Sequence, residues 1–123
     1  MQPLKVLVAD DNPDGRAILE RFLARKNHQA VFVADGAACV ERALSEDFDL
    51  VLLDMNMPVL DGWRAAERIR AAKTYAELPI IAFTAYAMQG DREKCLDAGC
   101  SDYLAKPIDF AELDALLRKH VRP

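Results

Sequence analysis

Short runs of apolar residues recur along the chain, each bounded by polar or turn-forming residues. The runs are Val6–Ala9, Ala30–Val33, Leu50–Leu53 and Ile80–Phe83, with a weaker fifth at Tyr103–Ala105. Runs of this length predict strands. Most are apolar at every position, which is typical of strands buried on both faces of a parallel sheet that helices cover. We therefore expect five strands in a central parallel sheet.

The segments between the runs repeat apolar residues at helical spacing, for example at Ile18, Leu19, Phe22 and Leu23. Asn12 followed by Pro13 resembles a helix N-cap with proline at the first helical position, and Asp109 resembles the N-cap of the last helix. Gly99 stands where a helix end requires a positive φ. These signals predict helices between the strands.

Strands that alternate with helices imply right-handed crossovers and an open, doubly wound α/β sheet. We expect the third helix over Asp61–Ala72 and the fourth over Gly90–Ala98. A chain of 123 residues is the size of one domain, so residues 1–123 are expected to form a single domain. In such sheets ligands bind beyond the carboxyl ends of the strands.

Polar residues that suit phosphoryl chemistry follow the apolar runs: Asp10, Asp11, Asp54, Asn56, Thr84 and Lys106. Three converging carboxylates cannot all stay ionised without a cation, so we expect a divalent ion, with Mg2+ the usual intracellular one. A carboxylate fixed at a strand end beside a metal is a nucleophile toward phosphorus. An ammonium and a hydroxyl would neutralise the transferred phosphoryl group. Any one such residue is more often a cap or a solvated turn, so the combination carries the prediction.

Composition excludes several other classes. The net charge is -4 and no run of Lys or Arg exceeds two residues, which disfavours direct nucleic-acid binding. No apolar stretch is long enough to span a membrane and no signal-peptide pattern is present, so a cytoplasmic protein is expected. Cys39, Cys95 and Cys100 are odd in number and lack a CxxC spacing, which favours free thiols in a reducing compartment.

Taken together, the motifs resemble the receiver domains of bacterial two-component response regulators. They are Asp10-Asp11, the segment from Asp54 to Gly62, Thr84-Ala85 and Lys106-Pro107, and the resemblance covers essentially the whole chain. It implies a flavodoxin-like sheet of strand order 2-1-3-4-5 with five helices. It also implies that a histidine kinase or histidine phosphotransfer protein phosphorylates Asp54. The face formed by the fourth helix, fifth strand and fifth helix would then change its affinity for an output partner.

The resemblance implies roles for the metal ligands. Asp11, the Asp54 carboxylate and the Asn56 backbone carbonyl would bind Mg2+ directly, and Asp10 would act through water. Asn56 also occupies a position that tunes the lifetime of the acyl phosphate in this family.

The resemblance also implies roles around the phosphoryl group. Lys106 would contact a phosphoryl oxygen, and a cis peptide bond before Pro107 would hold its ammonium toward the site. Thr84 would move toward the phosphoryl group, and Tyr103 would turn inward as an aromatic switch. Without the resemblance, Tyr103 is a plain strand aromatic. Tyr86 occupies a second position that tunes the acyl-phosphate lifetime.

Segments 84–92 and 98–103 look most like two subgroups of receivers. One comprises single-domain regulators of the cell-cycle type, and the other comprises the receiver domains of hybrid histidine kinases. The chain ends at Pro123 directly after the last expected helix, so no output domain is expected within it; a stand-alone receiver and an excised domain both fit. Trp63 has no implied role and is expected to be a partly exposed packing residue.

Three other functions share parts of the pattern. A phosphatase of the haloacid-dehalogenase type also uses a strand-end Asp, Mg2+, a Thr or Ser and a Lys, but it places a second Asp where this chain has Asn56. A flavin-binding module needs a phosphate loop after the first strand, where Asp10-Asp11 would repel phosphate. A degenerate receiver would lack Asp54, Lys106 or the acidic pair, and this chain has all of them.

Overall fold

The computed structural model describes residues 3–57, 60–84 and 91–120. Its elements are β1 (Lys5–Ala9), α1 (Pro13–Arg25), β2 (Gln29–Val33), α2 (Gly36–Ser45), β3 (Leu50–Asp54), α3 (Gly62–Ala72), β4 (Ile80–Thr84), α4 (Asp91–Asp97), β5 (Asp102–Ala105) and α5 (Phe110–His120). All strand pairs are parallel, and the sheet order is β2-β1-β3-β4-β5. The predicted fold class and strand order are confirmed.

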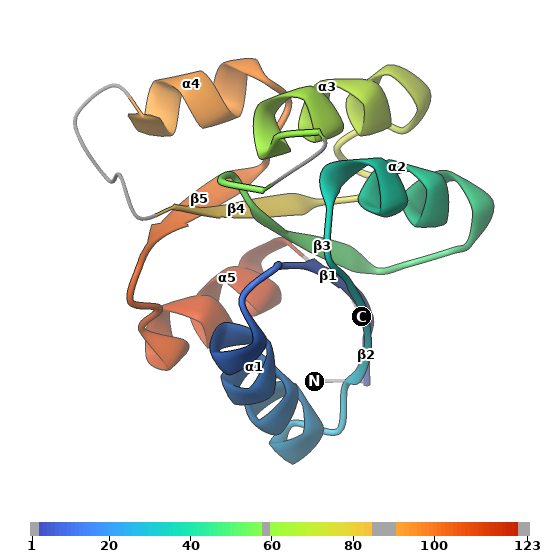
Figure 1. Ribbon diagram of the computed structural model, residues 1–123. Coiled ribbons are helices and arrows are strands. Elements are labelled where there is room, and N and C mark those ends of the chain that lie inside the picture. Colours follow the sequence, from blue (N-terminus) through green and yellow to red (C-terminus); the bar gives the residue numbers. More distant parts are fainter. Residues whose placement is uncertain (1–2, 58–59, 85–90, 121–123) are drawn as a thin grey trace.

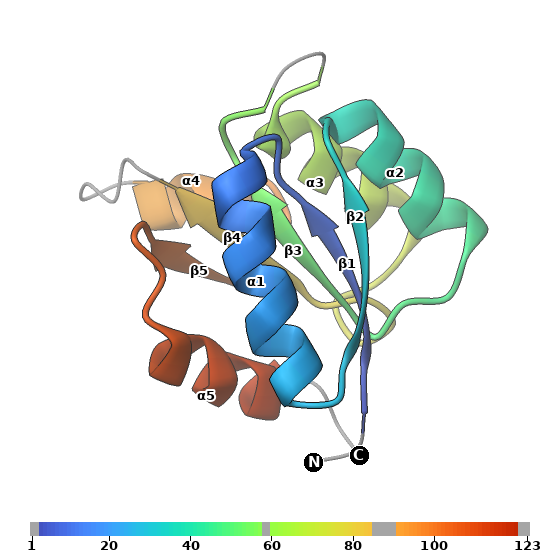
Figure 2. The ribbon, with the colours of Figure 1, turned by 60° about the horizontal axis from the view of Figure 1, so that its bottom comes forward.

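The molecule has three layers, with the sheet in the middle. Helices α2, α3 and α4 cover one face, and α1 and α5 cover the other (Figure 1). A turned view shows α1 and α5 side by side on their face (Figure 2), where the Phe22 and Phe110 rings stack with centroids 4.9 Å apart. Within the described residues, no helix is both long and apolar enough to cross a membrane.

Every predicted strand is present, and each extends one residue beyond its apolar run. Lys5 pairs with Gln29 at the start of the β1–β2 ladder, and Thr84 pairs with Ala105 at the end of the β4–β5 ladder. Ladder hydrogen bonds are made by the backbone, so they continue where the apolar side chains give way to polar ones. The third helix begins at Gly62 because Asp61 caps it instead of joining it. The fourth begins at Asp91; Gly90, where it was expected to begin, lies outside the described residues.

The predicted caps are confirmed. The Asn12 side chain accepts hydrogen bonds from the N–H groups at the start of α1, and the Asp109 side chain does the same for α5. Gly99 has φ 111°. The Cys100 N–H donates to the Cys95 carbonyl at 3.0 Å, which closes α4 with a Schellman motif.

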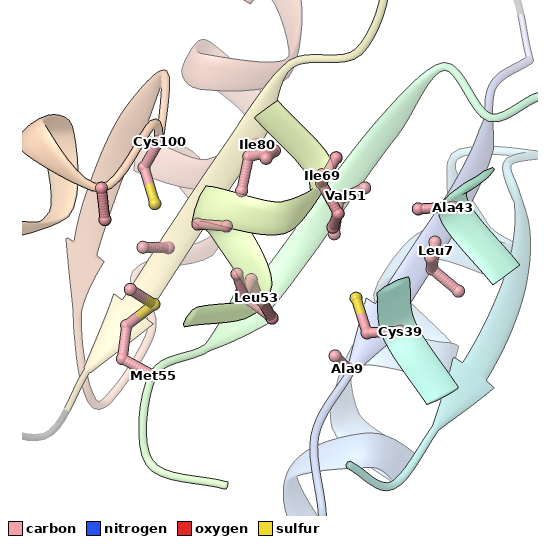
Figure 3. Close-up of a cluster of buried hydrophobic side chains, with 14 of the residues drawn as sticks. Leu7, Ala9, Cys39, Ala43, Val51, Leu53, Met55, Ile69, Ile80 and Cys100 are labelled. Atoms are coloured by element: carbon pink, nitrogen blue, oxygen red, sulfur yellow. The ribbon is translucent and has the colours of Figure 1, made fainter. Parts of the chain in front are cut away.

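The two faces of the sheet are packed with side chains of different size. On the α1–α5 face the buried residues are leucine, valine, isoleucine and phenylalanine, whereas alanine and cysteine are frequent on the α2–α4 face. In Figure 3, Cys39 and Ala43 of α2 face Leu7 and Ala9 of β1. All three predicted free cysteines are buried. Burial raises the pKa of the Cys39 thiol to about 12.

Arg70 joins three segments on the α2–α4 face. Its Nε donates to the Gly99 carbonyl at 2.8 Å, and its Nη1 donates to the Leu78 and Lys73 carbonyls at 2.9 and 3.2 Å. The guanidinium lies 4.0 Å from the centroid of the Tyr75 ring. Because a guanidinium has five donors in a fixed plane, one side chain satisfies carbonyls from the residue that follows α3, from the segment before β4 and from the turn after α4.

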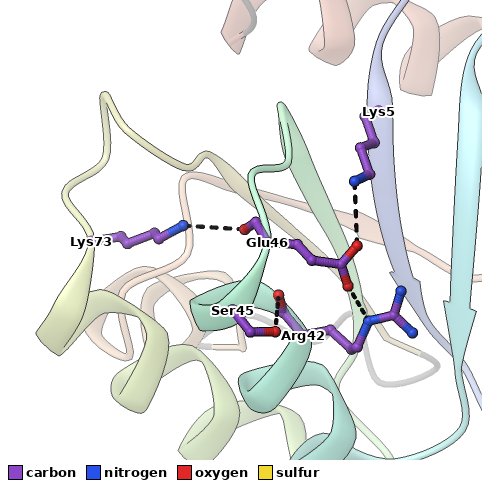
Figure 4. Close-up of polar contacts among 5 residues, drawn as sticks. All are labelled: Lys5, Arg42, Ser45, Glu46 and Lys73. Carbon is purple, nitrogen blue, oxygen red and sulfur yellow. Dashed lines mark hydrogen bonds and ion pairs between the residues drawn. The ribbon is translucent and has the colours of Figure 1, made fainter.

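A small ionic network links α2 to the start of β1 (Figure 4). The Glu46 carboxylate accepts hydrogen bonds from Lys5 Nζ at 3.3 Å and from Arg42 Nε, and the Glu46 carbonyl accepts one from Lys73 Nζ at 3.4 Å. The hydrogen bond from Arg42 is the largest cause that lowers the pKa of Glu46. Exposed ion pairs contribute little to stability, so the network chiefly fixes geometry.

His28 lies buried beneath the start of β1. The Leu4 N–H donates to its Nδ1 at 3.0 Å, so the neutral ring carries its proton on Nε2. Burial lowers the pKa of His28. A protonated ring would lose this acceptor and place a charge in the core.

Because of His28, the free energy of unfolding should therefore decrease as the pH is lowered. Its folded pKa lies below its unfolded value of about 6.5, so the contribution is complete above that pH and is lost as the pH falls below it. We expect urea unfolding between about pH 7.5 and 5.5 to show this loss. His28→Gln should flatten the pH dependence.

His120→Gln is the matched control, because it removes the only other imidazole of the chain. A pH dependence that disappears in His120→Gln and persists in His28→Gln would contradict the assignment.

Candidate active site

Backbone hydrogen bonds just beyond the strands bring the candidate residues to one edge of the sheet. The Asp10 N–H donates to Val33 of β2 at 3.1 Å, and the Lys106 N–H donates to Thr84 of β4 at 2.8 Å. Asp54 is the last residue of β3, and its Cα pairs with that of Phe83. The carboxyl ends of four neighbouring strands thus hold the site on rigid backbone.

Three of the predicted side chains form a carboxylate cluster. Asp10, Asp11 and Asp54 each offer an oxygen, and these oxygens lie within 4.8 Å of one another. Asp10 and Asp54 are buried, while Asp11 is exposed. The Asp10 carboxylate accepts a hydrogen bond from the Asn12 N–H, and the Asp54 carboxylate accepts one from the Asn56 N–H, both at 2.9 Å.

Lys106 supplies the positive charge of the cluster. Its Nζ lies 3.0 Å from Asp54 Oδ2 and 5.4 Å from the centroid of the Phe83 ring. The Asp54 side chain is 2% exposed and that of Lys106 31%, so the Asp54 carboxylate is enclosed while the Lys106 ammonium remains within reach of solvent. Three carboxylates and one ammonium leave two negative charges, which a divalent cation would balance.

The pKa of the Asp10 carboxyl is raised in this site. Burial raises the pKa of the Asp10 carboxyl, and the nearby charge of Asp54 raises it further. The hydrogen bond from the Asn12 N–H and the charge of Lys106 offset only part of this rise. A hard cation among the oxygens would offset the part of the rise that comes from the charge of Asp54.

The other predicted residues surround the cluster at different depths. Thr84 is buried at the end of β4, and half-buried Tyr103 of β5 packs against the core of the α2–α4 face. Asn56 is exposed, and the peptide bond between Lys106 and Pro107 is cis. Tyr86 lies outside the described residues.

An apolar cleft of about 340 Å³ opens beside the cluster. Asp10 and Lys106 line it together with apolar side chains from α1, from the segment before α5 and from the start of α5, among them Ile18, Ile108 and Phe110. Ile18 is 50% exposed. The cleft therefore continues the site toward an exposed apolar side chain of α1.

Gly62 is a structural requirement of the site that the sequence analysis did not explain. A Cβ atom on Gly62 would lie 2.5 Å from Met55 Cα and 2.8 Å from the Asp54 carbonyl oxygen, so only glycine lets α3 start against the end of β3. Glycine directly after an N-cap is a poor helix former, and that conflict was the available signal of close packing. The contact of Lys106 with Phe83 left no such local signal.

Comparisons with known proteins agree with this geometry. The family described as response regulator receiver domain matches residues 6–118. The signal transduction histidine-protein kinase BarA of Escherichia coli is 41% identical over 117 residues, which cover 95% of this chain and 13% of that kinase. The chain thus spans a small part of this relative.

Two solved structures are also similar. The receiver domain of sensor histidine kinase PA1611 from Pseudomonas aeruginosa is 42% identical, with a TM-score of 0.88 and coverage of 97% of this chain and 98% of that one; it holds a magnesium ion in its active-site cleft. The receiver domain of the Saccharomyces cerevisiae response regulator Ssk1, solved with the histidine phosphotransfer protein Ypd1, is 29% identical, with a TM-score of 0.88 and coverage of 97% and 89%.

The family match extends over most of the chain, and the similar proteins share its fold from the first strand to the last helix. The chain therefore belongs to the response regulator receiver domains of two-component signalling systems.

Proposed function

We propose that the chain is a phospho-acceptor receiver domain in which Asp54 takes a phosphoryl group from a phosphohistidine and so controls a binding surface. The observation that carries the proposal is the enclosed Asp54 carboxylate, held 3.0 Å from the Lys106 ammonium among two further carboxylates. A histidine kinase or a histidine phosphotransfer protein is the proposed donor. The yeast relative that is solved with such a protein supports this choice.

The donor set fits Mg2+. Asp10, Asp11 and Asp54 offer hard carboxylate oxygens within 4.8 Å of one another, and small hard cations prefer such ligands. We propose that Asp11, Asp54 and the Asn56 backbone carbonyl hold the ion directly and that Asp10 acts through water. When bound, Mg2+ would neutralise charge on the phosphoryl oxygens.

The proposed transfer is an in-line exchange at phosphorus. An Asp54 carboxylate oxygen attacks, a new O–P bond forms and the P–N bond to the donor imidazole breaks. The electron pair of the broken bond stays on the imidazole nitrogen, which leaves as neutral histidine after taking a proton. Lys106 then pairs with a phosphoryl oxygen instead of with the carboxylate alone, and we propose that the Thr84 hydroxyl binds a second one.

The apolar cleft beside Asp10 and Lys106 is the proposed route of the donor. A donor histidine must reach the Asp54 edge of the sheet, and the cleft is continuous with that edge. Exposed Ile18 on α1 offers apolar contact area to the donor. The proposed change of shape lies elsewhere, on α4, β5 and α5, and involves Thr84 and Tyr103.

The signalling role requires no turnover of an external substrate. We propose that the chemistry of the chain is limited to gaining and losing its own phosphoryl group. A phosphatase of the haloacid-dehalogenase type would need a general acid two residues after Asp54, and Asn56 cannot act as one. Residues 1–123 are proposed to form one such domain.

Phosphorylation is the direct test. The chain should gain the mass of one phosphoryl group when it is incubated with acetyl phosphate and Mg2+, and intact mass spectrometry would detect it. Asp54→Asn is the matched control and should gain nothing. A folded wild-type chain that gains no mass under these conditions, or an Asp54→Asn chain that does, would reject the assignment.

Removal of one metal ligand should abolish Mg2+ binding without unfolding the chain. At a Mg2+ concentration about a hundred times the Kd, bound Mg2+ should raise the free energy of unfolding by about 2.7 kcal/mol. Asp11→Asn should lose this rise because it lacks one of the proposed ligand carboxylates. It should remain folded because Asp11 is exposed and makes no part of the core. Asp14→Asn, a nearby exposed carboxylate outside the cluster, should keep it. Equal Mg2+ responses in both variants would count against the ligand set.

Lys106→Ala should separate metal binding from signalling. The three carboxylates remain, so the stabilisation by Mg2+ should persist, whereas phosphorylation should no longer change amide hydrogen exchange in α4, β5 and α5. Urea unfolding with and without Mg2+ measures the first result, and amide exchange measured by mass spectrometry before and after phosphorylation measures the second. A normal exchange response in Lys106→Ala would show that the ammonium has no part in the transmission.

A further inference from the structure

Trp63 is the only tryptophan of the chain, and nothing in the site described above uses it. It is the second residue of α3 and is half-buried. Its indole Nε1 is buried and has no hydrogen-bond partner among the described residues. The contacts that the structure shows for Trp63 are made by its ring, which packs against the core of the α2–α4 face and against Lys94.

The ring of Trp63 contacts a cation from the neighbouring helix. Lys94 of α4 places its Nζ 4.3 Å from the ring centroid, within the range of a cation–π interaction. Helix α4 has 7 residues, which is too short to be stable without tertiary contacts. The position of α4 therefore depends on contacts of this kind.

Two hollows flank the stacked pair. One, of about 670 Å³, is lined by Trp63 and Lys94 and also by Met55, Asn56 and Met57 of the loop that follows Asp54. The other, of about 400 Å³, is lined by the same pair and by α4 residues. Because Lys94 is exposed and borders both hollows, its contact with the Trp63 ring is the one that the structure shows for its ammonium among the described residues.

The start of α3, next to Trp63, packs closely against the end of β3. Gly62, the residue before Trp63, starts α3 against the backbone of Asp54 and Met55, with its N–H donating to the Met55 carbonyl at 3.3 Å. A displacement of the loop after Asp54 must therefore move the first turn of α3, and with it the ring on which Lys94 rests.

We propose that the Trp63–Lys94 stack is a joint that couples the position of α4 to the loop after Asp54. This inference rests on the proposed function and adds a connection through α3 to the one proposed through Thr84 and Tyr103. Trp63 and Lys94 are positioning residues, since neither touches the carboxylate cluster. Adjacency alone does not demonstrate coupling, so the experiment must measure α4 in both states of Asp54.

The first comparison uses the unphosphorylated chain and amide hydrogen exchange in α4. Loss of an exposed cation–π contact should raise the local opening of α4 about two- to fivefold in Lys94→Gln. Lys94→Arg keeps a cation for the ring and should stay close to the wild type. Arg92→Gln, which removes another exposed cation of α4, is the matched control and should have no such effect. Equal exchange in Lys94→Gln and Arg92→Gln would overturn the joint.

The second comparison repeats the exchange after phosphorylation with acetyl phosphate and Mg2+, with intact mass confirming equal modification. Phosphorylation should alter exchange in α4 of the wild type and of Lys94→Arg, and much less in Lys94→Gln and Trp63→Leu. The emission of Trp63 should change with phosphorylation in the wild type.

The outcomes separate the two proposals. A phosphorylated Lys94→Gln chain whose α4 responds like the wild type would overturn the coupling and leave the phospho-acceptor function standing. No phosphorylation of any variant would reject the function and the coupling together, while the first comparison would still decide whether the stack anchors α4.

Discussion

Repulsion among three carboxylates at one edge of the sheet is the constraint on which the rest of this site depends. Parallel strands carry Asp10 and Asp54 to the same edge, and their rigid backbone prevents the oxygens from moving apart. The Lys106 ammonium and two backbone N–H groups offset part of the repulsion. The remaining negative charge favours a divalent cation and, after it, an anionic phosphoryl group whose oxygens that cation and the ammonium can share.

The same constraint explains why the site lies on the sheet and why we propose that the response lies at α4, β5 and α5, beyond the strands that hold the carboxylates. The strands that carry the carboxylates are buried on both faces, so a change of charge at Asp54 cannot be absorbed by moving them. The α2–α4 face, with its alanine and cysteine residues, lets backbone come close to backbone. Gly62 against Met55 and Asp54 is one example, and it makes α3 a direct extension of the site.

Much of the fold and of the site could be predicted from the sequence because both depend on patterns of neighbouring residues. Apolar runs marked the strands, and the residue after each run marked the site, so Asp10, Asp54 and Lys106 were found together. The ends of strands were missed by one residue, as at Lys5, because backbone pairing does not depend on side-chain polarity. The contact of Trp63 with Lys94 could not be predicted, since it joins positions 31 residues apart and leaves no periodicity in either helix.

Arg70 adds a mechanical consequence for α4. Its Nε bond to the Gly99 carbonyl ties the turn after α4 to α3, and the Cys100 N–H closes the same turn onto Cys95. The carboxyl end of α4 is thereby a pivot fixed to α3, and Lys94 lies only about one helical turn from it. In the proposed coupling, a small sideways step of the ammonium on the indole ring, so close to the pivot, would become a larger displacement at the amino end of the helix. The proposed coupling would thus act close to the fixed end of α4 and show most at its amino end.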